Sequence, residues 1–345
     1  MSLHSEIFEQ PERLAKLVSS QRKTVEEIAQ AIKSRGVSYV FLAARGTSDN
    51  AGRYANYLFG AANRLPLALA TPSLFTYYQQ PPNLKGAFVI GISQSGQSPD
   101  IVSVLQEGKR QRCPTLAITN ESDSPLASHA DFVLDIQAGP ELAVAATKTY
   151  TAELMSIAMI SAALSGKQSA WDSLEKIPDW IHESLKADDM LRQAAERYRY
   201  MQQCVVLGRG YNYSTAFEWA LKLKELTYVE AEPYSSADFQ HGPIAIVAKG
   251  FPVMAVVSAG KVADSLTLLL DHLKRDLSAE LVVISNQEQA LALAQTRIPV
   301  SNEIPEALTP LVNIVPAQLF TYYLTLVKGF DAEAPRTLRK VTETR

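Results

Sequence analysis

Short runs of apolar residues alternate with longer amphipathic segments along the whole chain. The runs at residues 40–44, 88–92 and 116–119 are continuous and rich in branched side chains, and segments of helical periodicity such as 99–112 and 265–275 follow runs of this kind. Continuous apolar strands separated by helices are typical of parallel strands that are covered on both faces. The pattern therefore predicts an α/β fold with doubly wound parallel sheets.

The strand pattern occurs twice. Gly46, which ends the first apolar run, matches Gly210, and Gly96 matches Gly260 at the same separation of 164 residues. A third pair of apolar runs keeps the same order at nearly the same separation. Because order and spacing recur together, we interpret the chain as a tandem duplication in which each copy forms one sheet.

Length fits two domains better than one, because a chain of 345 residues exceeds the size of an ordinary single core. The predicted organisation is a helical lead-in (residues 1–35), a first domain (36–166), a helical connection (167–196), a second domain (197–330) and a C-terminal tail (331–345).

Two loops of the first half have the composition of a phosphate site. One contains Gly46, Thr47 and Ser48 after the first strand, and the other is the segment Ser93–Ser98. Small hydroxyl residues and glycine at a helix start offer hydroxyl donors, free N–H groups and the favourable end of the helix dipole. Ser98 before a proline is also ordinary helix capping. Two such loops at neighbouring strand ends, where α/β sheets bind ligands, favour the phosphate site.

The second half lacks this loop chemistry. Its corresponding loop, Ser258–Lys261, has lost most hydroxyl groups, so we expect the first half to hold phosphate and the second to supply catalytic side chains. The sequence has neither a Walker-type lysine motif nor a GxGxxG motif, so no nucleotide cofactor is predicted. Cys113 and Cys204 lie beside strand-like runs without metal-ligand partners, which indicates small buried residues, a reducing compartment and no metal site.

A charged helix face is the main catalytic candidate. Glu218, Lys222 and Glu225 follow at positions i, i+4 and i+7, which share one helix face. A surface stripe of ion pairs has the same spacing. Apolar neighbours on several sides indicate a largely buried helix instead, where charges persist mainly when paired or functional. His241 precedes a glycine and a proline, so it is expected on a loop, where histidine suits general acid–base chemistry.

Ser93–Gly96, together with the duplicated strand order, resembles the SIS (sugar isomerase) domain family. The segments Glu218–Glu225, His241–Ile244 and Pro335–Thr342 are similar to the isomerase half of glucosamine-6-phosphate synthase and to stand-alone SIS-type glucosamine-6-phosphate deaminases. The resemblance begins at Glu6 and covers nearly the whole chain. It implies two tandem SIS domains with flavodoxin-like sheets.

The resemblance also implies site residues, position by position. The implied phosphate contacts are Thr47, Ser48, Ser93, Gln94, Ser95 and Ser98, and the implied sugar contacts are Gly46 and Val144. The implied catalytic residues are Glu225 as the enolisation base, Glu218 and Lys222 as its helix partners, His241 for ring opening, and Lys340 as a tail lysine that meets the ketose carbonyl. In the family the residue matching His241 reaches the neighbouring subunit's site, so a homodimer with a shared His241 loop is implied.

Three departures from the synthase pattern bear on function. Arg45 replaces a cysteine, Trp219 replaces a glycine, and Gln97–Ser98 replaces a Glu–Thr pair, so the loops look more like the stand-alone deaminases. A glutaminase domain with a cysteine nucleophile is expected to be missing. The implied reaction is conversion of glucosamine 6-phosphate to fructose 6-phosphate and ammonia. Alternatives are the isomerase component of a glutamine–fructose-6-phosphate aminotransferase, a deglycase of phosphorylated sugar–amine adducts, a plain ketose–aldose isomerase and a non-catalytic sugar-phosphate sensor.

The net charge and the hydropathy pattern restrict the classes of binding partner that the sequence predicts. A net charge of −3 gives no electrostatic basis for nucleic acid. No secretory signal pattern is visible, and the apolar stretch Leu154–Leu164 is too short to span a bilayer, so it is expected to be a core helix. The sequence therefore predicts a cytoplasmic protein that binds a small phosphosugar, with no nucleic acid or membrane as partner.

Overall fold

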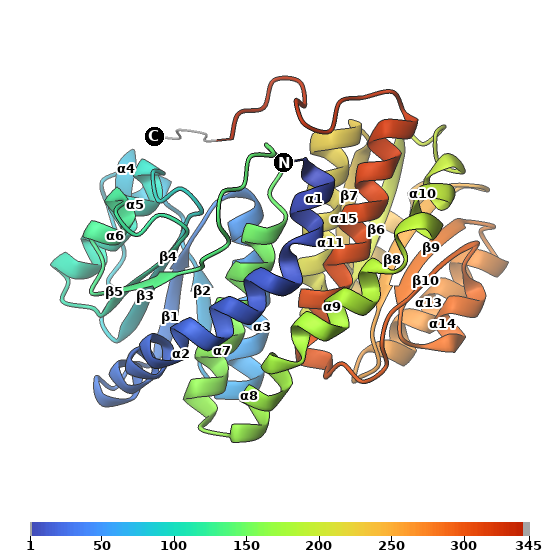
Figure 1. The fold of residues 1–345 in the computed structure, drawn as a ribbon. Helices are drawn as coiled ribbons and strands as arrows, with labels where there is room; N and C mark the ends of the chain where they lie inside the picture. Colours follow the sequence, from blue (N-terminus) through green and yellow to red (C-terminus); the bar gives the residue numbers. More distant parts are fainter. Residues whose placement is uncertain (1, 341–345) are drawn as a thin grey trace. The chain divides into compact units, whose positions relative to one another are not determined.

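The computed structural model describes residues 2–340, and the strands in these residues form two parallel five-stranded sheets (Figure 1). The first sheet contains β1 (Tyr39–Ala43), β2 (Leu67–Leu69), β3 (Ala87–Ile92), β4 (Thr115–Thr119) and β5 (Phe132–Asp135), and the second contains β6 (Gln203–Gly208), β7 (Glu230–Ser235), β8 (Pro252–Val257), β9 (Glu280–Ser285) and β10 (Thr296–Pro299). The strand orders are β2-β1-β3-β4-β5 and β7-β6-β8-β9-β10, which is one topology used twice. The predicted tandem doubly wound fold is confirmed.

The described residues group into two compact units, each built around one sheet. The first-repeat unit contains Glu12–Glu141, Lys148–Lys176 and the tail from Arg339, and the second-repeat unit contains the chain up to Pro11, Leu142–Thr147 and Ile177–Leu338. These units combine discontinuous segments, so the predicted domain limits, 36–166 and 197–330, remain a prediction.

In the first-repeat unit, helices cover both faces of the sheet. The helices are α2 (Gln10–Ser34), α3 (Gly46–Asn63), α4 (Ser73–Thr76), α5 (Pro99–Arg110), α6 (Pro125–Ser128), α7 (Lys148–Ser165) and α8 (Gln168–Glu175). Helices α5 and α6 lie on one face, and α3 and α7 lie on the other (Figure 1). Gly108 lets α5 approach β3 closely, because an added Cβ there would lie 2.9 Å from a methyl group of Val89. The stretch Leu154–Leu164 lies in α7, whose side chains are buried through Ala162.

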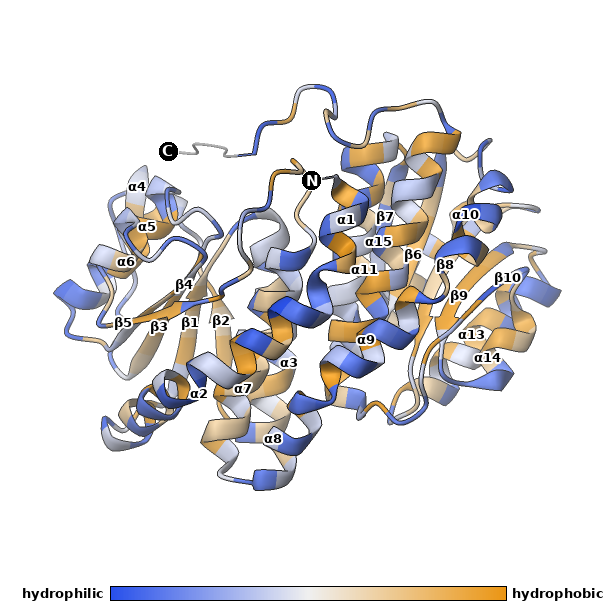
Figure 2. Cartoon of the chain, viewed as in Figure 1, coloured by the Kyte–Doolittle hydropathy of each residue, from blue (hydrophilic) through white to orange (hydrophobic). Residues whose placement is uncertain are grey.

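The second-repeat unit repeats this arrangement. Its helices are α1 (Leu3–Phe8), α9 (Ile177–Leu185), α10 (Asp188–Glu196), α11 (Tyr213–Lys222), α12 (Ser236–Gln240), α13 (Ala263–Arg275), α14 (Glu288–Leu293) and α15 (Thr309–Val327), with short helical turns η1 (Gly210–Asn212), η2 (Leu223–Thr227), η3 (Pro243–Ile246) and η4 (Glu306–Leu308). Helices α13 and α14 cover one face of the apolar strands, and α11 and α15 cover the other (Figures 1 and 2).

Helix α15 is unusually apolar. Glu306–Val327 is the one helical segment among residues 2–340 that is long and apolar enough to cross a membrane, and 83% of its most apolar window is buried within the structure. Burial of this kind is typical of a core helix packed between other elements.

Candidate active site

The strand order creates a switch point in the first sheet. Because β1 lies between β2 and β3, the connections that leave β1 and β3 run to opposite sides, and α/β sheets bind ligands at the carboxyl ends of such a strand pair. The loop after β1 leads into α3 at Gly46, and the loop Ser93–Ser98 leads from β3 into α5. Both predicted phosphate loops therefore lie where this fold binds ligands.

The Ser93–Ser98 loop is tightly built. Gly96 adopts a φ of +61°, and an added Cβ there would lie 2.0 Å from Oγ of Ser124, so only glycine fits. The backbone N–H of Gly96 donates to Oγ of Ser93 at 3.1 Å. Ser98 occupies the N-cap position of α5, but within the described chain its side chain makes no capping hydrogen bond; its Oγ lies 3.4 Å from that of Ser93. Ordinary helix capping therefore does not account for the Ser98 hydroxyl. Gln94 and Ser95 are half-buried on this loop.

An ion pair connects the two loops. Nε of Arg45 donates to Oδ2 of Asp100 at 2.7 Å, and the Asp100 side chain is 1% exposed. The other Asp100 oxygen accepts the N–H of Ile101 at 2.9 Å, in the first turn of α5. The residue that departs from the synthase pattern thus fixes the start of α3 relative to the start of α5. The sequence did not reveal this role, because the partners lie 55 positions apart.

Ser48 already has an internal acceptor. Its hydroxyl is buried and donates to Oε1 of Glu153, in α7, at 2.8 Å, while Thr47 beside it is half-buried. A hydroxyl has one hydrogen to donate, so Ser48 can donate to a phosphate oxygen only after releasing Glu153. Burial raises the pKa of Asp49, the next residue of α3, whereas the Arg53 and Arg45 guanidinium groups oppose that shift.

In the second-repeat unit, a carboxylate of the protein lies against the loop that corresponds to Ser93–Ser98. Glu306, in η4, accepts the N–H of Lys261 at 3.1 Å, and an added Cβ on Gly260 would lie 2.0 Å from its carboxyl carbon. The carboxylate thus lies against the loop that precedes α13, at the helix end that favours negative charge. The chain itself fills this position, which supports a phosphate site in the first repeat. The sequence pattern did not identify Glu306, which lies 45 residues from its donor.

The predicted charged face forms a contiguous group in α11 and η2. Nζ of Lys222 lies 3.5 Å from Oε1 of Glu218 and 2.5 Å from Oε2 of Glu225. The side chains of Glu218 and Lys222 are 0% and 3% exposed, and that of Glu225 is 23% exposed. A surface stripe of ion pairs would leave all three in solvent, so that alternative does not describe these residues. Glu225 is the member of the group that reaches solvent.

The helix widens at the charged group. After Lys222, the segment Leu223–Thr227 forms a π-helical turn that ends at Tyr228 with a φ of +56°. π-Turns are uncommon and occur frequently at functional sites. The α-helical geometry predicted for residues 218–225 therefore ends at Lys222. The Glu225 side chain still contacts Lys222 from the π-turn.

His241 lies directly after α12, on an exposed loop. Its own N–H donates to the carbonyl of Asp238 at 3.0 Å, and Gly242 adopts a φ of +134°, a conformation that favours glycine. The following turn, η3, leaves Ile246 50% exposed.

Val144 lies half-buried in the segment Leu142–Thr147. The buried Glu6 carboxylate of α1 accepts the N–H of Leu142 at 2.5 Å, and the Gln318 amide of α15 donates to the carbonyl of Thr147 at 3.4 Å. Elements from both ends of the chain therefore shape this segment within the second-repeat unit.

The predicted site residues divide between the two units. The first-repeat unit contains Gly46, Thr47, Ser48, Ser93, Gln94, Ser95, Ser98 and Lys340, and the second-repeat unit contains Val144, Glu218, Lys222, Glu225 and His241. Lys340 is the last described residue; Val341 and Thr342 of the tail motif lie outside the described residues.

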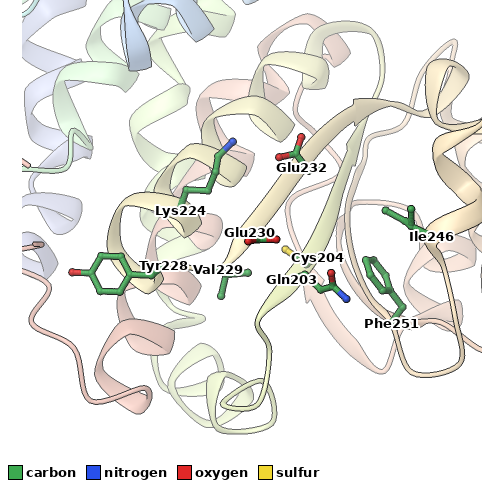
Figure 3. A pocket seen from close by; sticks show the side chains of 9 residues that line it. All are labelled: Gln203, Cys204, Lys224, Tyr228, Val229, Glu230, Glu232, Ile246 and Phe251. Carbon is green, nitrogen blue, oxygen red and sulfur yellow. The ribbon is translucent and has the colours of Figure 1, made fainter. Parts of the chain in front are cut away.

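A hollow of about 380 Å³ lies at the edge strand β7, and Lys224, the chain neighbour of Glu225, is among the residues that line it (Figure 3). It is lined by Gln203, Cys204, Lys224, Tyr228, Val229, Glu230, Glu232, Ile246 and Phe251. Burial raises the pKa of the Cys204 thiol to about 12, so this cysteine offers no nucleophile at neutral pH.

In residues 2–340, no three His, Cys, Asp or Glu side chains are grouped to hold a metal ion. The glutamates of β7 keep an exposed strand edge charged, which discourages pairing with other chains.

Comparisons with known proteins agree with the duplicated architecture. The SIS domain model matches residues 35–163 and again residues 200–328. A glutamine–fructose-6-phosphate aminotransferase (isomerizing) of Thermococcus kodakarensis is 32% identical over an alignment of 345 residues. The alignment covers 97% of this chain and 56% of that protein. The chain thus spans little more than half the length of this curated relative.

Solved structures show the same fold. The C-terminal domain of glucosamine-fructose-6-phosphate aminotransferase from Francisella tularensis superposes with a TM-score of 0.85 at 26% identity, covering 96% of this chain and 98% of that one. A glucosamine-6-phosphate deaminase from Thermotoga maritima shares the fold at 21% identity, with a TM-score of 0.80 over the full length of both chains. With two matched domains over most of its length, this chain belongs to the SIS domain family.

Proposed function

We propose that this protein converts glucosamine 6-phosphate and water into fructose 6-phosphate and ammonia, an aldose–ketose isomerisation coupled to amine loss. The observation that carries the proposal is the buried Glu218–Lys222–Glu225 group, in which a lysine lies between two carboxylates. Burying charge costs free energy, and such groups are kept mainly where they do chemistry or specify structure. The relatives' names, which refer to fructose 6-phosphate and glucosamine 6-phosphate, support this substrate class.

The chemistry needs one base and a stabilised enolate-like intermediate. A proton leaves carbon 2 of the ring-opened amino sugar and returns at carbon 1, which leaves an imine at carbon 2 that water hydrolyses to the ketone and ammonia. Glu225 is the proposed base, and the positive charge of Lys222 beside it favours the negative charge that develops. The hydroxyl loops of the first repeat are proposed to hold the phosphate, His241 to open the ring, and Lys340 to meet the carbonyl.

A second candidate is the reverse, aminating reaction. The curated relative is an aminotransferase of which this chain matches 56%, so the chain can correspond to the isomerase component of such an enzyme. The same residues would then catalyse the same steps in the opposite direction, with ammonia as the amine source.

The deciding experiment measures both directions. The purified protein is incubated with the 6-phosphates of glucosamine, mannosamine and galactosamine and with a glycated amine adduct, and ammonia and ketose are measured. A parallel arm supplies fructose 6-phosphate with ammonia. Ammonia and fructose 6-phosphate from the glucosamine substrate alone support the deaminase. A free amine released only from the adduct identifies a deglycase. Tight binding of a phosphosugar without turnover contradicts an enzyme and supports a sensor.

We also propose a homodimer with shared sites, and a mixing experiment tests it. His241 and the apolar Ile246 that follows are exposed, as a loop that contacts a second copy would be. Co-expressed Glu225→Gln and His241→Ala chains should recover about a quarter of wild-type activity, because half the dimers are hybrids with one intact site of two. If His241 serves its own chain's site, each hybrid site carries one defect and no activity returns. A fully active monomer in light scattering also contradicts the proposal.

A further inference from the structure

Lys340 has an unexpected environment for a residue near the chain end. Lysines in irregular terminal segments are ordinarily solvated. Nζ of Lys340 instead lies 2.5 Å from Oε2 of Glu141, and the side chains are 24% and 0% exposed, respectively. Both residues belong to the first-repeat unit. The tail lysine is therefore paired with a fully buried carboxylate.

Glu141 is fixed independently of the tail. Its Oε1 accepts the backbone N–H of Thr149 at 3.1 Å, and its Oε2 accepts the Thr149 hydroxyl at 2.9 Å. Thr149 lies in the first turn of α7, an 18-residue helix, so the carboxylate caps that helix and is stabilised by its dipole. The anchor is thus preformed on rigid structure, and the Lys340 ammonium group lies beside this buried charge and stabilises it.

We propose that Glu141 is the positioning residue for Lys340: it holds the ammonium group, and with it the tail, in one place. This inference rests on the proposed function for its catalytic consequence, because Lys340 is proposed to meet the substrate carbonyl. A flexible lysine loses much conformational freedom when it reaches a reacting atom, and a preformed carboxylate removes that loss before substrate arrives. Nothing in the sequence pattern singled out Glu141, which lies 199 residues from Lys340.

The first test needs no substrate. Lys340 in the full-length protein is acylated with an amine-reactive ester and its labelling rate is followed by mass spectrometry, with exposed Lys85 of the same unit as internal reference. Glu141→Gln keeps an acceptor for Thr149 but removes the charge, so Lys340 labelling should speed up about tenfold or more, as loss of a hydrogen bond between charged groups predicts. Glu141→Asp should restore part of the protection. Glu121→Gln, at an exposed glutamate of the same unit, is the matched control and should change nothing. Unchanged labelling in Glu141→Gln overturns the anchor.

The second test asks whether the anchor serves catalysis. Glu141→Gln should lower kcat with little change in KM, since the phosphate loops are untouched, and Glu141→Gln combined with Lys340→Met should be no worse than Lys340→Met alone. Additive losses, or faster labelling with wild-type kcat, overturn the catalytic part and leave a tail clamp. If Glu141→Gln fails to fold, Lys340→Met carries the kinetic test, and wild-type kcat in that variant overturns the catalytic part of the inference, while labelling of Glu141→Asp decides the anchor. A wild type inactive on every phosphosugar contradicts the proposed function, while the labelling result still decides the anchor.

Discussion

Replacing Glu225 with glutamine should lower turnover by about a hundredfold or more, because the amide cannot take up the proton that must move between carbon 1 and carbon 2. Glutamine keeps the size and hydrogen-bonding capacity of the side chain, and Glu225 is the partly exposed member of its group, so the fold should tolerate the change. Binding of the ring-opened substrate should persist. The measurement is kcat and KM with the preferred hexosamine phosphate, together with the thermal unfolding midpoint.

Hydrogen exchange separates a base from a structural partner. In deuterated water, the wild type should exchange deuterium into carbon 1 of fructose 6-phosphate, and Glu225→Gln should not. Glu218→Gln should have a smaller effect on exchange, since the proposed role of Glu218 is to orient Lys222, whose Nζ lies 3.5 Å from it. Glu232→Gln changes an exposed glutamate on β7 of the same unit and is the matched control. Exchange at the wild-type rate in Glu225→Gln would mean that another residue is the base.

The interior of both sheets was predictable from the sequence, whereas their edges were not. The central strands β1, β3, β4, β6, β8 and β9 coincide with the apolar runs, because strands covered on both faces must be continuously apolar. Edge strands obey weaker constraints. Strand β2 is apolar but only three residues long, and β7 contains Glu230, Glu232 and Pro233, so neither has the long apolar run of a central strand. The topology that places the loops depends on these edges.

The sequence likewise predicted some features of the candidate site and missed others. Loop composition predicted a phosphate site at Ser93–Ser98, because consecutive small hydroxyl residues and glycine are visible in the sequence, and this assignment stays a prediction. The contacts made by Arg45, Glu141 and Glu306 were missed, because each joins segments 45 or more residues apart and has no local signature. The π-turn after Lys222 was missed for another reason: it is a small change in helix winding that tertiary packing selects.

Removing two hydroxyl groups from the Ser93–Ser98 loop should weaken phosphosugar binding about a hundredfold or more, since each hydrogen bond to a charged group contributes about 1.5–3 kcal/mol. The variant is Ser93→Ala combined with Ser95→Ala. Ser93 is buried and its Oγ accepts the Gly96 N–H, which also donates to the Ser93 carbonyl at 3.1 Å and so keeps a partner. Loss of the hydroxyl should therefore lower the free energy of unfolding by only about 0.5–1.5 kcal/mol. Calorimetric titration of the phosphosugar measures the affinity, and thermal unfolding shows whether the protein remains folded.

The matched control lies in the other repeat. Ser258 occupies the loop that corresponds to Ser93–Ser98, and its Oγ accepts from the amides of Asn212 and Asn313. Ser258→Ala should therefore reduce stability by at least as much as the double variant, about 1–3 kcal/mol, for loss of a buried acceptor that two amides share. It should leave phosphosugar affinity unchanged, because the Glu306 carboxylate already lies against that loop. Equal loss of affinity in both variants would mean that lowered stability explains the effect. Unchanged affinity in the double variant would remove the phosphate from the first-repeat loop altogether.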